Sequence, residues 1–218
     1  MTTHGSILIT GFAPFAGDAV NPSQEIVQAL DGQTIDGHTV VGAVLPVAFA
    51  QTPALLDTLL VRHRPRLVLA LGLACGRAEL SFERVAINLI DARIADNDGE
   101  QPIDELVTDD APAAYFATLP LKAIVAQLHE AGIPAGLSLS AGSFVCNQVF
   151  YLLAHRLASR SPLTRCGFVH LPLLPEQVAA HPGQPSMTLA MMIEGIRTAI
   201  ECALVVRSDL RVHGGSIA

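Results

Sequence analysis

The segment SILITGFAPFAGDAVNPSQEIVQALDG, residues 6–32, predicts a strand, a loop and a helix in succession. Its apolar start, Ser6–Thr10, is typical of a buried strand that ends at a glycine. Asn21 and Pro22 then mark a helix start, with asparagine as the N-cap and proline in the first helical position. Gly32 is placed to end that helix. A strand followed by an amphipathic helix is the repeating unit of α/β folds.

The same alternation of short apolar runs and amphipathic stretches continues along the chain. Further strands are expected at Thr39–Leu45, Leu67–Leu71, Phe82–Leu89, Gly136–Ser140 and Gly167–His170. Further helices are expected to begin at Thr52 and to span Leu121–Ala131, Phe144–Ala158 and Ser186–Val206. Residues 91–112 are polar and rich in turn formers, which predicts a long loop. We therefore expect one α/β sandwich domain that covers residues 1–218.

Composition excludes several classes of protein. The 218 residues are 50% hydrophobic and 15% charged, which favours a large buried core over disorder. The net charge is −7, from 13 basic and 20 acidic residues, and no long basic cluster occurs. Because phosphate contacts dominate the affinity of nucleic-acid binders, this balance argues against that function.

Membrane insertion and export are not expected either. The longest apolar runs, Val40–Ala50 and Leu67–Cys75, are shorter than the roughly 20 residues that a membrane-spanning helix needs. The N-terminus MTTHGSILITGF lacks the basic region and cleavage site of a signal peptide. We expect a cytoplasmic protein.

The four cysteines are dispersed and form no CxxC pair, which predicts free thiols in a reducing compartment and no zinc site. Cys146 follows the loop 140–143 near the start of a predicted helix, where backbone N–H groups and the helix dipole stabilise a thiolate. The alternative is that Cys146 belongs to the buried stripe of that helix, and its position alone favours core packing. Its stripe would comprise Cys146, Val149, Phe150, Leu153 and Leu157.

A nucleophilic thiol needs a base and a group that orients the base. His170 ends an apolar strand, and ligand crevices form at strand ends in α/β sheets. Glu83 enters an otherwise apolar strand, where a buried carboxylate would need a partner such as histidine. The alternatives are a partly buried histidine bonded to a carbonyl, and a glutamate paired with a surface arginine. The other histidines, including His4, His38, His155 and His181, lie in contexts that predict surface positions.

Phenylalanines are placed where they could form a pocket. Phe12 and Phe15 lie in the glycine-bounded loop after the first strand, and Phe144 lies two residues before Cys146. Loop phenylalanines need burial, either in ordinary core packing or in the wall of an apolar pocket.

Taken together, these motifs resemble one family of cysteine peptidases, pyroglutamyl peptidase I, also called pyrrolidone-carboxylate peptidase. The resemblance spans most of the chain in the family's order. Its segments are ITGFAPFAGDAVNPS (9–23), FERVAIN (82–88), DARIADNDGEQP (91–102), SAGSFVCN (140–147) and GFVHLP (167–172).

The resemblance implies roles for individual residues. Cys146 is the implied nucleophile, His170 the general base and Glu83 the residue that orients the base. Arg93 is the implied arginine near the oxyanion, beside the backbone N–H of Cys146. The walls of the slot for the pyroglutamate ring are implied to be Phe12, Phe15, Phe144 and Ile94.

The resemblance also implies a fold, an assembly and a substrate. The fold is a three-layer α/β/α sandwich with a twisted, mostly parallel, mixed central sheet. The implied assembly is a homotetramer, the substrates are peptides with N-terminal pyroglutamate, and no metal or cofactor is needed. The chain departs from the family's pattern at Leu73, where many members carry glutamine, and at Val47, where some carry threonine. We therefore assign recognition of the lactam amide mainly to backbone groups.

Two other functions are compatible with parts of the sequence. A phosphorylase acting on nucleosides is suggested by fold analogy alone, and no GxxxxGK[ST] phosphate loop occurs. A non-catalytic module that binds blocked peptide N-termini would not need Cys146, His170 and Glu83 together.

Overall fold

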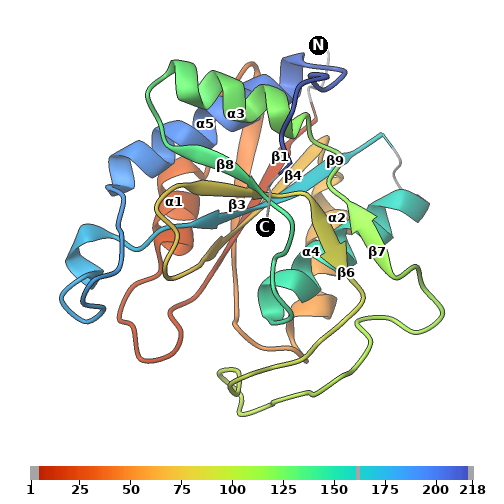
Figure 1. Ribbon diagram of the computed structural model, residues 1–218. Helices are drawn as coiled ribbons and strands as arrows, with labels where there is room; N and C mark the ends of the chain where they lie inside the picture. The colour runs from red at the N-terminus through yellow and green to blue at the C-terminus, as the bar shows by residue number, and fades with distance from the viewer. Residues whose placement is uncertain (1–4, 161–162, 216–218) are drawn as a thin grey trace.

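A seven-stranded mixed sheet forms the centre of the computed structural model, which describes residues 5–160 and 163–215 (Figure 1). The strand order is β2-β3-β1-β4-β9-β5-β8. Strands β3, β1, β4 and β9 are parallel, whereas β5 and β8 run antiparallel to β9 and β2 antiparallel to β3. The strands are β1 (Ile7–Phe12), β2 (Thr34–Ile35), β3 (His38–Leu45), β4 (Leu67–Leu73), β5 (Leu80–Glu83), β8 (Ala135–Ser138) and β9 (Arg165–Leu171).

Helices cover both faces of this sheet and create two separate apolar cores. Helices α1 (Pro22–Leu30), α3 (Leu121–Glu130) and α5 (Leu189–Val205) pack on one face, as Figure 1 shows. Helices α2 (Thr52–His63) and α4 (Val145–Arg160) pack on the other. Successive residues of β1 alternate between the cores, with Ile7 and Ile9 in the first and Leu8 in the second. The expected three-layer sandwich with a mostly parallel sheet is confirmed.

The first βα unit forms as its sequence predicts. The side chain of Asn21 accepts a hydrogen bond from the backbone N–H of Ser23 at 3.1 Å, which caps α1. Gly11 lets the helix approach the strand, because a Cβ at this position would stand only 2.4 Å from the carbonyl oxygen of Ser23. The hydroxyl of Ser23 in turn accepts the N–H of Phe12 at 2.9 Å. This packing fixes the end of β1, where the loop with the phenylalanines begins.

Two expected elements differ from those observed. The single strand expected at Phe82–Leu89 is wrong: the chain leaves the central sheet after β5, and β6 (Val85–Ile87) pairs instead with β7 (Ala114–Phe116) in a separate two-stranded sheet. The last helix begins later than expected, because the hydroxyl of Thr188 accepts the N–H of Met191 and caps α5 there. A short 3-10 helix, η1 (Pro175–Gln177), precedes it.

The long loop between β6 and β7 extends beyond the sandwich, at the bottom of Figure 1. Asp96 ties it down: its two carboxylate oxygens accept the N–H groups of Phe49, Asp98 and Glu100 at 2.8–2.9 Å. Among the described residues, no helix is long and apolar enough to cross a membrane.

Candidate active site

A cavity of about 310 Å³ opens where several strands of the central sheet end. Phe12 ends β1, Leu73 ends β4, and Val47 follows the end of β3. The first turn of α4 closes the cavity with Val145 and Cys146. This is the carboxyl edge of the parallel strands, where α/β sheets form their ligand crevices. The complete lining is Phe12, Phe15, Ala16, Asp18, Val20, Asn21, Val47, Leu73, Cys75, Arg93, Phe144, Val145, Cys146 and His181.

Cys146 is the second residue of α4, among the first backbone N–H groups of the helix, which lack intrahelical partners. Its Sγ atom packs on the backbone of Gly72, where a Cβ would stand only 2.9 Å from the sulfur. Gly72 is the registered neighbour of His170 across the β4–β9 pair, and neighbouring strands lie about 4.8 Å apart. The fold therefore seats the thiol beside His170.

Burial at this position disfavours the thiolate form of Cys146. Its burial raises its pKa to about 12, and the negative charge of Glu83 acts in the same direction. The backbone hydrogen bond of Cys146 opposes this effect without overcoming it. A thiolate can form here only if a neighbouring group takes the proton and carries a compensating positive charge.

His170 is held by Glu83. Its Nδ1 atom lies 2.8 Å from Oε1 of Glu83, and both side chains are buried, with Glu83 fully so. In the antiparallel β5–β9 register, Ser81 is opposite His170 and Glu83 opposite Phe168, so the pair is a diagonal one on the same face of the sheet. Because an ionised carboxylate only accepts hydrogen bonds, Nδ1 carries the proton in this contact. The other ring nitrogen, Nε2, is left free to exchange a proton.

The structure also decides between the alternatives that the sequence left open for these residues. Glu83 is not at the surface: an arginine, Arg77, does lie near it, with Nη2 3.7 Å from Oε1, but the shorter contact is to His170. Cys146 packs against the apolar core beneath α2 and α4, as its helical position predicts, and it also lines the cavity. Packing and access to a ligand are therefore combined at this cysteine.

The cavity is lined by three phenylalanines, Phe12, Phe15 and Phe144. The rings of Phe15 and Phe144 lie 5.3 Å apart between centroids. Phe49, which the sequence did not single out, packs edge-on against Phe144 at 5.1 Å and 82° from behind. Since Asp96 holds the backbone N–H of Phe49, the long loop helps to position the aromatic wall.

Arg93 brings the long loop to the cavity. It is exposed and lines the same cavity as Cys146. Ile94, the next residue, is 37% exposed and is not part of the cavity lining in the described structure. Ser143 anchors this end of the loop, because its hydroxyl donates to the carbonyl oxygen of Asp91 at 2.8 Å.

The sequence did not identify the polar rim of the cavity. His181, expected at the surface, lines the cavity and pairs with Asp18 through Nε2 and Oδ1 at 2.9 Å. Its short segment after η1 carries no periodic pattern that would have placed it there. His155 and His38 are also less exposed than expected: His155 bonds the Tyr115 hydroxyl at 2.8 Å. His38 bonds the carbonyl oxygen of Gly5, whereas His4 lies outside the described residues.

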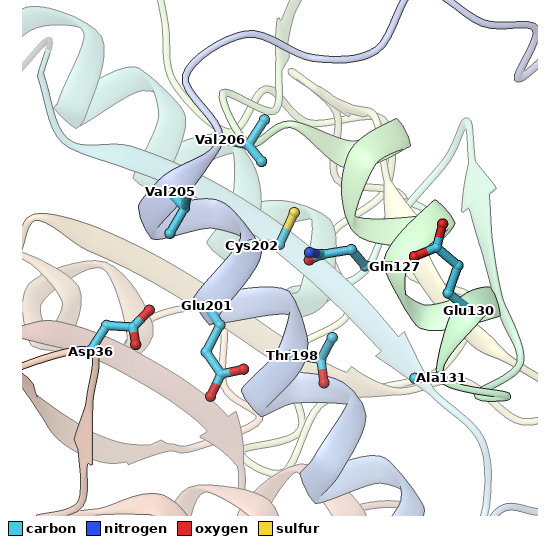
Figure 2. A pocket seen from close by; sticks show the side chains of 9 residues that line it. All are labelled: Asp36, Gln127, Glu130, Ala131, Thr198, Glu201, Cys202, Val205 and Val206. Atoms are coloured by element: carbon cyan, nitrogen blue, oxygen red, sulfur yellow. The ribbon is translucent and has the colours of Figure 1, made fainter.

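Figure 2 shows a second hollow, of about 490 Å³, between α3, α5 and the turn after β2. It is lined by carboxylates, Asp36, Glu130 and Glu201, and by the sulfur of Cys202. Burial, followed by the charge of Asp36, raises the pKa of Glu201. No histidine lines this hollow within the described structure, so the thiol of Cys202 has no Cys–His pairing there. Nor do the described residues contain a group of three or more His, Cys, Asp or Glu side chains that could hold a metal ion.

Comparison with known proteins agrees with this geometry. The pyroglutamyl peptidase family model matches residues 5–206. The chain belongs to this family. A pyrrolidone-carboxylate peptidase of Cupriavidus taiwanensis is 53% identical over 213 residues, which cover 97% of this chain and 99% of that protein. One from Klebsiella pneumoniae is 50% identical, covering 96% and 98% of the two chains.

Solved structures of the family share the fold. The pyroglutamyl peptidase I of Bacillus amyloliquefaciens superposes with a TM-score of 0.93 at 38% identity, covering 97% of this chain and all of that one. A mutant pyrrolidone carboxyl peptidase of Pyrococcus furiosus gives 0.89 at 44% identity, with 91% and 98% covered. The family consists of cysteine peptidases that remove N-terminal pyroglutamate, so the resemblance seen in the sequence is confirmed.

Proposed function

We propose that the chain removes N-terminal pyroglutamate from peptides, with Cys146 as nucleophile, His170 as general base and Glu83 as the residue that orients the base. The observation that carries this proposal is that the buried pair of His170 and Glu83 lies beside Cys146, which lines the cavity. The Nδ1–Oε1 bond of 2.8 Å holds the imidazole, and the thiol is seated on Gly72, the strand neighbour of His170. A nucleophile, its base and an orienting group within one site are the requirements of covalent acyl transfer.

The reaction starts with transfer of the thiol proton from Cys146 to Nε2 of His170. The thiolate attacks the carbonyl carbon that joins pyroglutamate to the next residue. Glu83 stabilises the imidazolium through the proton on Nδ1. Because burial raises the pKa of the thiol, formation of the thiolate depends on His170 as the proton acceptor.

The negative charge that develops on the carbonyl oxygen is stabilised by the backbone N–H of Cys146 and by Arg93. The first turn of α4 adds its dipole. The imidazolium of His170 then protonates the departing amine, and a thioester remains on Cys146. Water, deprotonated by the same histidine, hydrolyses the thioester and releases pyroglutamate.

Specificity follows from the cavity walls. Phe12, Phe15 and Phe144 are proposed to enclose the flat lactam, with Ile94 adding apolar contact at the mouth. The lactam carries no charge and no free α-amino group. An N-terminal glutamate or glutamine would bring charges into this apolar slot without partners for them, which is costly. Leu73 and Val47 in the walls offer the lactam amide no hydrogen bond, and we assign its recognition mainly to backbone groups.

We also propose that the chain acts in the cytoplasm as a homo-oligomer, a tetramer by the family resemblance. Apolar side chains exposed outside the cavity support association, because monomeric proteins rarely leave large apolar patches uncovered. Among them are Leu106, Phe116 and Leu139, exposed by 57%, 70% and 57%.

The proposed function is tested with a pyroglutamyl amide reporter and a matched alanyl amide reporter under reducing conditions near pH 7.5. We expect cleavage of the first and not of the second. Cys146→Ala should lose cleavage while keeping the circular dichroism spectrum of the folded chain, and Cys166→Ala should retain cleavage. A wild-type protein without activity would overturn the function, and loss of activity in Cys166→Ala alone would overturn the nucleophile. Tight binding of a pyroglutamyl peptide without turnover would support a binding module instead.

A further inference from the structure

Arg77 contacts the buried carboxylate that orients the proposed base. It lies in the turn between β4 and β5, and its Nη2 atom is 3.7 Å from Oε1 of Glu83. This is the same oxygen that bonds Nδ1 of His170 at 2.8 Å. The guanidinium reaches from the surface, where its side chain is 38% exposed, to a carboxylate that is fully buried.

A second contact holds the guanidinium in this place. Nη2 donates a hydrogen bond to the hydroxyl of Ser138 at 3.3 Å. Ser138 is the registered partner of Glu83 across the β5–β8 pair and is itself buried. Its hydroxyl also lies 3.3 Å from the carbonyl oxygen of Ser140, to which it donates. The position of Arg77 is therefore set by the strand beside Glu83.

Glu83 needs this cation. A buried carboxylate is costly unless it is paired, and Oε2 of Glu83 has no hydrogen-bond partner in the described structure. The groups that face it are His170 from β9, Cys146 from α4 and Arg77 from the β4–β5 turn, while β8 supplies only the neutral Ser138. His170 must be neutral to act as a base, and the thiol opposes a neighbouring negative charge. Of these groups, Arg77 alone is permanently positive.

We propose that Arg77 is a positioning residue for this peptidase: it holds the carboxylate of Glu83 in place, so that the proton of His170 stays on Nδ1 and Nε2 stays ready to accept the thiol proton. This inference rests on the proposed function. Arg77 does not line the cavity and acts on the reaction through Glu83 and His170. Without this ion pair Glu83 loses the contact that holds its carboxylate against Nδ1, and the imidazolium is less well stabilised.

The test is the pH dependence of kcat/KM for the pyroglutamyl reporter in Arg77→Met and Arg77→Lys. In Arg77→Met we expect kcat to fall about tenfold with little change in KM, because the substrate cavity is untouched. The acid limb of the profile should move to higher pH by about half a unit, a modest shift since the guanidinium is partly exposed to water. Arg77→Lys restores the charge without the bond geometry and should return the acid limb toward its wild-type position.

Controls separate this role from effects on folding or net charge. Arg84→Met removes a cation one residue beyond Glu83 that forms no ion pair with it in the described structure, and its acid limb should match wild type. Ser138→Ala loosens the guanidinium and should move the limb in the same direction as Arg77→Met, by less. If Arg77→Met lowers thermal stability but leaves the limb of the remaining active enzyme unmoved, the positioning role is wrong. An inactive wild-type chain would instead overturn the proposed function itself.

Discussion

Nδ1 of His170 lies 2.8 Å from Oε1 of Glu83, although the two residues are 87 positions apart in sequence. The contact joins two neighbouring antiparallel strands of the central sheet, β9 and β5. Both side chains are buried, so the ring has one orientation that satisfies its hydrogen bonds.

Glu83→Gln should lower kcat by about a thousandfold with little change in KM, because an amide can donate to Nδ1 and stabilise the wrong ring tautomer. Steady-state kinetics with the pyroglutamyl reporter measures this. Glu83→Asp keeps the charge on a shorter side chain and should retain more activity than the glutamine variant. Equal activity in the glutamine variant and the wild type would contradict the orienting role.

Gly72→Ala should reduce kcat by about a hundredfold or more, since its Cβ would stand 2.9 Å from the sulfur of Cys146 and 2.9 Å from the ring of Phe168. The matched control is Gly195→Ala on α5, where a Cβ would stand 2.4 Å from Leu80 in the opposite core. Both variants should lose thermal stability. Only Gly72→Ala should lose activity per folded molecule. A similar loss of activity in both variants would contradict a specific role for the contact between Gly72 and the sulfur of Cys146.

Asp96→Asn should weaken substrate binding and raise KM. One of its oxygens accepts the N–H of Phe49 and the other accepts those of Asp98 and Glu100, and an asparagine amide can replace only one of these acceptors. The expected cost in unfolding free energy is about 1–3 kcal/mol. Asp98→Asn is the control, because Asp98 is exposed and accepts only from the side chain of Gln51. An unchanged KM in Asp96→Asn would contradict the hypothesis that the loop positions the phenylalanines of the cavity.

Alkylation of Cys146 should depend on His170. The pKa of this thiol is raised to about 12, so without a proton acceptor on the order of one molecule in ten thousand is ionised at pH 8. In His170→Ala, labelling of Cys146 by iodoacetamide should therefore be slow at pH 8 and rise about tenfold per pH unit toward pH 11. Exposed Cys75 serves as an internal control in the same peptide map. Undiminished labelling of Cys146 in His170→Ala at pH 8 would show that another group takes its proton.

Alkaline pH should destabilise the fold partly through Cys166. Burial raises the pKa of this thiol from 9.0 to about 12, so the unfolded chain loses its proton first. The resulting stability is complete below pH 9 and is lost as the pH rises from about 9 to 12. Between pH 8 and 10.5 the loss of unfolding free energy from this thiol is about 2 kcal/mol. Urea unfolding should show a smaller alkaline loss in Cys166→Ala than in wild type, whereas Cys75→Ala should behave as wild type.

Local patterns made most of the fold predictable. Asn21 and Pro22 start α1 where expected, and Gly132, with its positive φ of 72°, follows α3 as a stop. The strand expected at 82–89 was wrong because local periodicity does not show where a chain leaves one sheet and joins another. That change is set by tertiary bonds: the N–H of Arg84 bonds Ser138 and its carbonyl accepts from Ala117.

The proposed site was predictable where family motifs cover it. Phe49, Asp18 and His181 were missed because each acts through a partner far away in sequence. His181 is 163 residues from Asp18, and no local spacing records that contact. Arg77 lies close to Glu83 in sequence, but the contact of its guanidinium with Ser138 of β8 is long-range and leaves no local pattern.

The proposed catalytic residues lie on two separate elements that meet at Gly72. Glu83 and His170 are locked together within the sheet, whereas Cys146 belongs to a helix that rests on it. A small slide of α4 over Gly72 would change the reach of the sulfur while leaving the carboxylate–imidazole pair intact. Substitutions at residues that pack α4 against the sheet can thus change the turnover rate without touching the peptide.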